Sequence, residues 1–253
     1  MSKKAALVTG AATGIGKSAV LALARAGYDV AINYSSSEKA ARETATEAAK
    51  LGVNTLILKC DVADETGVRA MLKQVKDKFG RLDVLINNAG TTASFKLRDL
   101  ESLSLEEWDR VFAVNVRGTF QVTRACLPLL EQAPAAAVVN LCSIAGLRPS
   151  AQPFPYAASK AAVANLTRTL AGQLGPRGIR VNAVAPGWME GEWMASTLGE
   201  DYRRLMDRRA RQTPLRRCVT PDEVAVTIAN LVTSNPFVTG EIVVIDGGFA
   251  AVT

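Results

Sequence analysis

A tyrosine, a lysine and a serine stand at spacings that could place three polar groups around one carbonyl. Tyr156 precedes Lys160 by four residues, so on a helix both side chains project from the same face. A phenol titrates near about 10, and an adjacent fixed cation lowers that pKa and makes the phenol a better proton donor and acceptor. Ser143 adds a hydroxyl thirteen residues upstream. These residues predict acid–base chemistry at a carbonyl or alcohol, although a surface Tyr–Lys pair would look the same in isolation.

A glycine-rich stretch near the N-terminus has the order expected of a dinucleotide-binding loop. The apolar run 5–8 leads into Gly10, Gly14 and Gly16, and an apolar-periodic segment follows over 17–26. In a strand–turn–helix unit, such glycines allow the tight turn, the approach of backbone to pyrophosphate, and close helix packing. The helix N-terminus then presents its unpaired amides to the phosphates. An ordinary glycine turn is the alternative.

The chain contains no histidine. This excludes Ser-His-Asp hydrolysis, histidine-assisted cysteine chemistry and the usual zinc sites, so no metal site is predicted. The four cysteines show no paired spacing and are expected to be reduced thiols. Proton transfer therefore falls to Tyr, Lys, Asp or Glu, which supports a mechanism centred on the tyrosine.

Seven strand-like runs alternate with segments of helical periodicity. They lie at 5–9, 29–33, 55–60, 84–86, 137–142, 180–185 and 242–245. Apolar, β-branched runs of this kind suit parallel strands that are buried on both faces. No linker or internal repeat divides the 253 residues. We predict a single α/β domain over 1–253 with a Rossmann fold, a doubly wound parallel sheet of about seven strands with helices on both faces.

The net charge of +6 does not indicate a nucleic-acid-binding protein, because acidic and basic residues are interspersed and no such motif is present. Seven arginines lie in 203–217, with only Asp207 as a counter-charge. They predict either a solvated helix face or a patch that steers an anionic substrate or carrier. No signal-peptide core or membrane-length apolar run is found, so we expect a cytoplasmic protein.

Several motifs occur together and in a fixed order. They are the glycine loop, Asn87-Asn88-Ala89-Gly90 after the run 84–86, Asn115, Ser143, Tyr156 and Lys160. In this combination the chain resembles the classical short-chain dehydrogenases/reductases over essentially its whole length, and is most similar to 3-oxoacyl-[acyl-carrier-protein] reductases. The resemblance implies reversible hydride transfer between a nicotinamide and a carbonyl carbon. It also implies a homotetramer in which 115–130, 157–174 and 239–253 lie between subunits.

The resemblance assigns four catalytic residues. Ser143 positions the carbonyl and Tyr156 donates the proton. Lys160 lowers the pKa of the tyrosine and holds the nicotinamide ribose. Asn115 stands in an otherwise apolar helical stretch, where a buried amide needs partners. The resemblance implies that it bends its helix and holds a water in a proton relay, and a satisfied core amide is the alternative.

The resemblance also places a cofactor site at the carboxyl ends of the strands. Asp61 and Val62 are expected to hold the adenine, and the loop 87–90 to support the adenosine side. The cofactor-binding residues expected are Gly10, Thr13, Gly14, Ile15, Gly16, Asn33, Tyr34, Ser35, Asp61, Val62, Asn88, Ala89, Gly90, Tyr156, Lys160, Pro186 and Gly187.

The second strand favours NADP(H) over NAD(H). An NAD-specific enzyme usually has an acid at the end of this strand to accept from the ribose 2′-hydroxyl. Here Asn33-Tyr34-Ser35 follow, with no acid before Glu38. Thr13 departs from the pattern, since a basic residue often stands there in NADP enzymes, and Lys17 could compensate. NAD(H) is the alternative cofactor.

The substrate is less well defined by the sequence. Trp188, Met189, Trp193 and Met194 predict an apolar, adaptable lid within 188–217, and packing of this segment against the body is the alternative. Many relatives have a threonine a few residues past Pro186-Gly187, but here the first is Thr197.

Segment 131–136 lacks the basic residues that are common in reductases acting on acyl-carrier protein, which leaves Arg177 and the arginine-rich segment 203–217 as the candidate contacts for a carrier. A reductase of a free ketone, sugar, polyol or small hydroxy-acid derivative is therefore an alternative. A dinucleotide-binding regulator without turnover is a third hypothesis. Such a protein would be expected to lack the Ser, Tyr or Lys, and all three are present here.

Overall fold

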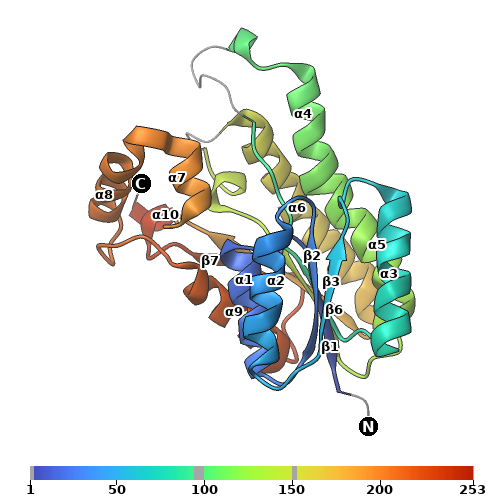
Figure 1. Ribbon diagram of the computed structural model, residues 1–253. Coiled ribbons are helices and arrows are strands. Elements are labelled where there is room, and N and C mark those ends of the chain that lie inside the picture. The colour runs from blue at the N-terminus through green and yellow to red at the C-terminus, as the bar shows by residue number, and fades with distance from the viewer. Residues whose placement is uncertain (1–2, 94–99, 150–152, 253) are drawn as a thin grey trace.

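A parallel sheet forms the centre of the protein in the computed structural model, which describes residues 3–93, 100–149 and 153–252 (Figure 1). Its strands are β1 (Ala5–Val8), β2 (Asp29–Tyr34), β3 (Thr55–Lys59), β4 (Val84–Asn87), β5 (Ala136–Leu141), β6 (Ile179–Pro186) and β7 (Ile242–Ile245). They pair in the order β3-β2-β1-β4-β5-β6-β7, parallel throughout. The predicted doubly wound sheet is confirmed, and each strand begins and ends within one residue of its predicted range.

Helices cover both faces of this sheet. One face carries α1 (Gly14–Arg25), α2 (Glu38–Ala49) and α9 (Pro221–Thr233), and the other carries α3 (Glu65–Phe79), α5 (Thr119–Leu130) and α6 (Phe154–Leu174). Figure 1 shows α1 and α2 on one side of the strands and α3 and α5 on the other. The remaining helices are α4 (Leu105–Phe112), α7 (Glu192–Leu198), α8 (Tyr202–Gln212) and α10 (Phe249–Val252).

Successive residues of the central strands pack into two different cores. In β1, Ala6 and Val8 belong to the core shared with α1, α2 and α9, whereas Leu7 belongs to the core shared with α3, α5 and α6. All of these side chains are fully buried. Because neither face of β1 meets water, this strand is apolar at every position. Polar residues within β5 and β6, such as Asn140 and Asn182, are buried as well.

A buried polar ladder ties the central strands to the helices on one face. Asn87 Nδ2 donates to Asn140 Oδ1 and to Thr123 Oγ1, both at 2.9 Å. Asn140 Nδ2 in turn donates to Thr167 Oγ1 at 3.0 Å. Buried amides are costly unless hydrogen-bonded, so these contacts fix β4 and β5 against α5 and α6.

The turn after β5 packs directly against the backbone of α6. At Gly146, an added Cβ would lie 2.4 Å from the carbonyl carbon of Lys160 and 2.5 Å from the amide nitrogen of Ala161. These are backbone atoms in mid-helix, which cannot move aside as a flexible side chain would. The absence of a side chain at this glycine therefore sets how closely α6 approaches β5.

We expect Gly146→Ala to push α6 away from β5 and to lower the free energy of unfolding by roughly 1–3 kcal/mol, the usual cost of overpacking. Gly172 serves as the control position. It is exposed on α6, and a Cβ added there meets nothing within 4 Å. Gly172→Ala should raise the free energy of unfolding by about 0.5–1 kcal/mol. Urea unfolding of both variants measures this, and a Gly146→Ala protein as stable as wild type would contradict the packing.

Candidate active site

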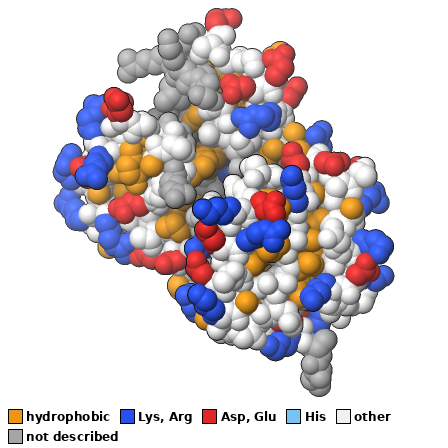
Figure 2. Space-filling model, in the orientation of Figure 1, with side chains coloured by type: hydrophobic (Ala, Val, Ile, Leu, Met, Phe, Trp, Pro, Cys, Tyr) orange, Lys and Arg blue, Asp and Glu red, His pale blue; other side chains and the backbone are white. Residues whose placement is uncertain are grey.

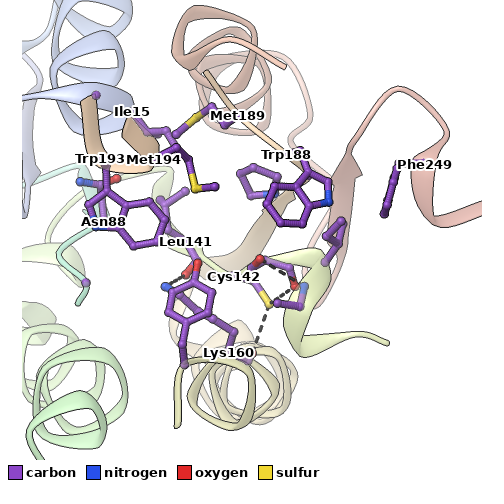
Figure 3. Close-up of a pocket in the computed structure, with 18 of the residues that line it drawn as sticks. Ile15, Asn88, Leu141, Cys142, Lys160, Trp188, Met189, Trp193, Met194 and Phe249 are labelled. Carbon is purple, nitrogen blue, oxygen red and sulfur yellow. Dashed lines mark hydrogen bonds between the residues drawn. The ribbon is translucent and has the colours of Figure 1, made fainter. Parts of the chain in front are cut away.

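A pocket of about 420 Å³ opens at the carboxyl edge of the sheet (Figure 3). Its size suits a small-molecule ligand. Strand ends, the N-terminus of α1, one side of α6 and the lid segment 188–217 all contribute to its wall. The predicted site residues that line it are Gly10, Thr13, Gly14, Ile15, Asn88, Ala89, Gly90, Ser143, Tyr156, Lys160, Pro186 and Gly187.

The glycine loop forms a backbone cradle at one end of this pocket. Gly10 and Gly14 adopt φ angles of +59° and +55°, which favour glycine. A Cβ on Gly16 would lie 2.3 Å from the carbonyl oxygen of Gly10, so only glycine lets α1 begin so close to the loop. Thr13 makes no side-chain cap and the first turn of α1 holds no acid. The cradle therefore fits the pyrophosphate of a dinucleotide.

Hydrogen bonds from the loop after β4 hold the cradle in place. Asn88 Nδ2 donates to the carbonyl oxygens of Thr9 and Gly10 at 2.9 and 2.8 Å. Thr9 Oγ1 accepts from the backbone amides of Asn88 and Ala89, both at 3.0 Å. Asn88 was predicted from its motif. Thr9 was not predicted as a site residue, although a hydroxyl at the end of β1 was a visible signal.

Ser143, Tyr156 and Lys160 meet at the other side of the pocket. The Tyr156 hydroxyl is hydrogen-bonded to the Ser143 side chain. Lys160 Nζ donates to the carbonyl oxygen of Leu141 at 2.7 Å and lies 5.6 Å from the centroid of the Tyr156 ring. Lys160 is only 5% exposed. The end of β5 and the first turns of α6 thus bring the three side chains together as the spacing predicted.

Burial dominates the acid–base properties of this pair. It raises the pKa of Tyr156 to about 12, although the hydrogen bond with Ser143 acts in the opposite direction. It lowers the pKa of Lys160 to about 8. The pKa of Tyr156 is therefore raised overall, because loss of hydration disfavours the charged form of either group. That Lys160 lowers the pKa of the tyrosine stays a prediction.

Asn115 lies in a π-helical turn, Ala113–Gly118, between α4 and α5. Its Oδ1 accepts from the amide of Thr91 at 2.8 Å, and its Nδ2 donates to Ser159 Oγ at 2.9 Å. A Cβ on Gly90 would lie 3.4 Å from Asn115 Oδ1 and 3.6 Å from Lys160 Nζ, so both atoms face the space beside Gly90. Asn115 is 1% exposed and does not line the pocket itself. The irregular helix expected here is present, and such turns are frequent at functional sites.

The residues expected on the adenosine side are divided: Asn88, Ala89 and Gly90 line the pocket, whereas those at or just after the ends of β2 and β3 lie outside it. Asn33 is buried, accepting at Oδ1 from the amide of Gly10 at 3.3 Å and donating from Nδ2 to the carbonyl oxygen of Cys60 at 3.0 Å. Its side chain therefore braces the cradle, which differs from the expected contact with a cofactor. Tyr34 is also buried, whereas Ser35 is exposed just past β2.

The acid expected at the adenine is engaged locally. Asp61 Oδ1 accepts from the amide of Ala63 at 2.8 Å, and the carbonyl oxygen of the buried Val62 accepts from Gln121. Lys17, which could have compensated for Thr13, forms an ion pair with Glu47 at 2.8 Å.

The predicted apolar lid lines the pocket. Trp188, Met189, Trp193 and Met194 all contribute to the wall, and the Trp193 ring centroid lies 5.9 Å from that of Tyr156. Figure 3 shows these lid residues above Lys160. Met194 also packs with Met206 and Cys218 in a small core of the lid's own. Segment 188–217 thus contributes to the pocket wall and is also packed in a small core, as both interpretations of its apolar side chains expect.

The arginine-rich segment is less uniform than the sequence suggested. Figure 2 shows basic side chains gathered over α8, but Arg204 pairs with Asp201 at 2.7 Å and Arg217 pairs with Glu223 at 2.5 Å. Both acids lie outside the interval in which only Asp207 was counted. Arg209 is partly buried and lines the pocket. The other lining residues that were not predicted are Leu141, Cys142, Ile144, Ala145, Arg148, Pro149, Gln212 and Phe249.

Within the described part of the chain, no cluster of Cys, Asp or Glu could hold a metal ion. The cysteines Cys60, Cys126, Cys142 and Cys218 are unpaired and buried. No helix in the described ranges is both long enough and apolar enough to cross a membrane.

Comparison with known proteins places relatives across the whole chain. A family model described as enoyl-(acyl carrier protein) reductase matches residues 10–250. The 3-oxoacyl-[acyl-carrier-protein] reductase FabG of Staphylococcus epidermidis is 38% identical over 246 residues, which cover 97% of this chain and 98% of the relative.

Two solved structures show the same fold at similar coverage. A protein described as a short-chain dehydrogenase/reductase from Burkholderia xenovorans is 34% identical with a TM-score of 0.91, over 99% of both chains. An NAD⁺-bound xylitol dehydrogenase is 30% identical with a TM-score of 0.89, over 97% of this chain and 98% of the other.

The buried lysine makes a testable contribution to pH-dependent stability. Burial lowers the pKa of Lys160 from its ordinary 10.5 to about 8, so between these values the unfolded chain binds more protons than the folded protein. Stability should therefore rise with pH from about 8 to 10.5 in the wild type because of this group. In Lys160→Met this rise should be missing. The free energy of unfolding of the variant, relative to that of the wild type, should therefore be highest below pH 8. Urea unfolding across this range measures it, and parallel pH profiles would refute it.

Proposed function

Because the chain belongs to the short-chain dehydrogenase/reductase family of oxidoreductases that act on CH–OH groups, we propose that it reduces the carbonyl of a 3-oxoacyl thioester with NADPH. One observation carries the proposal: Ser143, Tyr156 and Lys160 line the same pocket as the dinucleotide cradle. A carbonyl held by the hydroxyl groups can thus lie within reach of a nicotinamide. Similarity to FabG reductases over nearly the full length supports the 3-oxoacyl group.

The cofactor would supply the hydride, and the protein supplies binding and orientation. Gly10, Gly14 and Ile15 at the N-terminus of α1 would hold the pyrophosphate, and Lys160 would hold the nicotinamide ribose. Pro186 and Gly187 line the pocket beside the lid, where they would contact the nicotinamide end.

Ser143 and Tyr156 would act on the substrate oxygen. Ser143 donates a hydrogen bond that orients the carbonyl. Tyr156 donates its phenolic proton to the oxygen as negative charge develops there. A pKa raised to about 12 keeps the phenol protonated at neutral pH, which is the form that reduction requires.

Lys160 and Asn115 would return the proton. With a pKa of about 8, the lysine is mostly an ammonium at neutral pH and can stabilise the phenolate that proton donation leaves. Asn115 Oδ1 faces the same space beside Gly90 as Lys160 Nζ. A water in that space would bridge Lys160 Nζ and Asn115 Oδ1. Through Lys160 it would return a proton to the Tyr156 phenolate.

A second substrate class is favoured by one observation. Arg177, a candidate contact for a carrier protein, forms an ion pair with Glu131. Segment 131–136 contains no basic residue, so the arginine-rich segment 203–217 is the remaining candidate contact for a carrier. A small free ketone, sugar or polyol is therefore the alternative substrate, and the structural similarity to xylitol dehydrogenase supports it.

Self-association as a homotetramer is also proposed. A groove between α4, α5 and α6 is lined by Phe112, Val116, Phe120 and Leu166. Phe120 is exposed, as are Val244 in β7 and Val252 at the C-terminal end. Apart from Phe112, these apolar side chains lie in the segments that the family resemblance places between subunits.

Tyr156→Phe should remove the transferable proton and keep the ring. Turnover should fall by at least the roughly 10²-fold typical of lost acid catalysis, while NADPH binding is retained. NADPH oxidation with acetoacetyl thioesters, free ketones and xylulose measures it, and near-wild-type turnover would remove the tyrosine from the mechanism. If the wild type binds NADPH but reduces none of these compounds, a regulator without turnover replaces the enzyme.

NADPH should bind more tightly than NADH, because the exposed residues after β2 include no acid before Glu38 and Glu38 is paired with Arg42 at 2.7 Å. Ser35→Asp should reverse the preference, since a carboxylate there accepts from the 2′-hydroxyl and repels a 2′-phosphate. Titration of nicotinamide fluorescence measures both. A wild-type preference for NADH of about tenfold, or about 1.4 kcal/mol, would overturn the assignment.

A further inference from the structure

Arg209, on α8, places a positive charge in the pocket wall. Its guanidinium carbon lies 4.4 Å from the centroid of the Trp188 ring and 5.9 Å from that of Phe249. Nη1 donates to Gln212 Oε1 at 3.0 Å. Nε is buried and has no hydrogen-bond acceptor among the described residues. Two aromatic rings and a glutamine thus hold this guanidinium in position.

Arg209 differs from Arg203, Arg208 and Arg211 in being partly buried, and from Arg204, Arg216 and Arg217 in its hydrogen-bond partners. Arg204 and Arg217 pair with carboxylates, and Arg216 donates to the carbonyl oxygen of Arg211 at 2.7 Å. For Arg209, no carboxylate partner is found in the described part of the chain. Burial, together with the nearby Arg208, lowers the pKa of Arg209. The protein therefore maintains a partly desolvated cation here without a counter-charge of its own.

The charge of the pocket points in the same direction. The charged residues lining it are Arg148, Lys160 and Arg209, and no Asp or Glu is among the described lining residues. A cleft lined by one sign of charge attracts ligands of the other sign. The cradle accounts for a dinucleotide pyrophosphate, and Lys160 serves Tyr156. The two arginines have no such role in the reaction.

Both guanidinium groups flank one aromatic ring. The Arg148 guanidinium carbon lies 5.5 Å from the Phe249 ring centroid, close to the corresponding 5.9 Å of Arg209. In Figure 3, Phe249 and Ile15 of the cradle lie on opposite sides of Trp188. The arginines therefore mark a part of the pocket separate from the cradle, where the far end of a substrate would lie.

We propose that Arg209, assisted by Arg148, binds an oxyanion carried by the substrate and thereby selects anionic carbonyl compounds over neutral ones. The inference rests on the proposed function, because the anion must belong to the molecule whose carbonyl meets Ser143 and Tyr156. A guanidinium binds carboxylate and phosphate alike. For a 3-oxoacyl group, the oxyanion is either the phosphate of a pantetheine thioester or the carboxylate of a free 3-oxo acid.

Two matched substrate pairs separate these sources. Acetoacetyl-CoA and acetoacetyl-N-acetylcysteamine share the thioester, but only the former carries phosphate. Acetoacetate and ethyl acetoacetate share the ketone, but only the former carries a carboxylate. NADPH oxidation is measured with wild type, Arg209→Gln and Arg209→Lys. Arg208→Gln is the control, because Arg208 is exposed on the same helix and is not among the lining residues.

The measured quantity is the ratio of kcat/KM between the anionic and neutral members of a pair. Arg209→Gln should lower this ratio by roughly 10- to 100-fold in one pair, as expected for a lost charge-assisted hydrogen bond. Arg209→Lys should retain part of the ratio, because it keeps the charge. Arg208→Gln should leave it unchanged. The pair that responds identifies the source of the oxyanion.

Equal losses on both members, or an unchanged ratio in both pairs, would overturn the inference and leave Arg209 as a support for Trp188 and Phe249. If the wild type reduces none of the four compounds, the 3-oxoacyl function fails and ligand binding decides the inference separately. Acetoacetate should then quench tryptophan fluorescence of the NADPH complex at lower concentration in wild type than in Arg209→Gln. Equal midpoints for the two proteins would overturn it.

Discussion

The close approach of α6 to the end of β5 is the contact on which the candidate site depends. Gly146 leaves room for the backbone of α6 at Lys160, and Lys160 Nζ then reaches the carbonyl oxygen of Leu141. With this spacing fixed, the Tyr156 hydroxyl meets the Ser143 side chain. A methyl group added at Gly146 would displace α6 and move the Tyr156 phenol away from the Ser143 hydroxyl, because a close-packed interior transmits such a shift.

The same burial that fixes the geometry sets the electrostatics. Burial raises the pKa of Tyr156 and lowers the pKa of Lys160. The neutral form of each side chain is therefore more favoured in the protein than in water. The described pocket wall adds two more cations and no carboxylate. A pocket of this kind is complementary to anions, and each anion that enters favours the ammonium of Lys160. Binding of an anionic cofactor would therefore change the acid–base state of Tyr156 and Lys160 through the charge of the pocket.

Polar side chains at the strand ends act mainly on the backbone of neighbouring loops. Asn88 and Thr9 fasten the cradle to the loop after β4, and Asn33 fastens it to β2 and β3. Asn115 joins the loop after β4 to α6 through Thr91 and Ser159. These bonds pre-organise the amides that a dinucleotide would contact, so little ordering remains for the binding step.

The sequence by itself determined the strands, the glycine cradle and the Tyr–Lys pair, because each depends on patterns that are local in the chain. The contact of Ser143 with Tyr156 depends in addition on the packing of α6 against β5. Only the tertiary structure decided the rest. Asn33 lies in a strand buried on both faces, so no alternation in the sequence could reveal that its side chain turns toward the cradle. Arg148, Arg209 and Phe249 come from three separate segments and meet through packing, which leaves no spacing to recognise. The pKa values of Tyr156 and Lys160 follow from desolvation, a property of the folded surroundings that residue type and spacing do not contain.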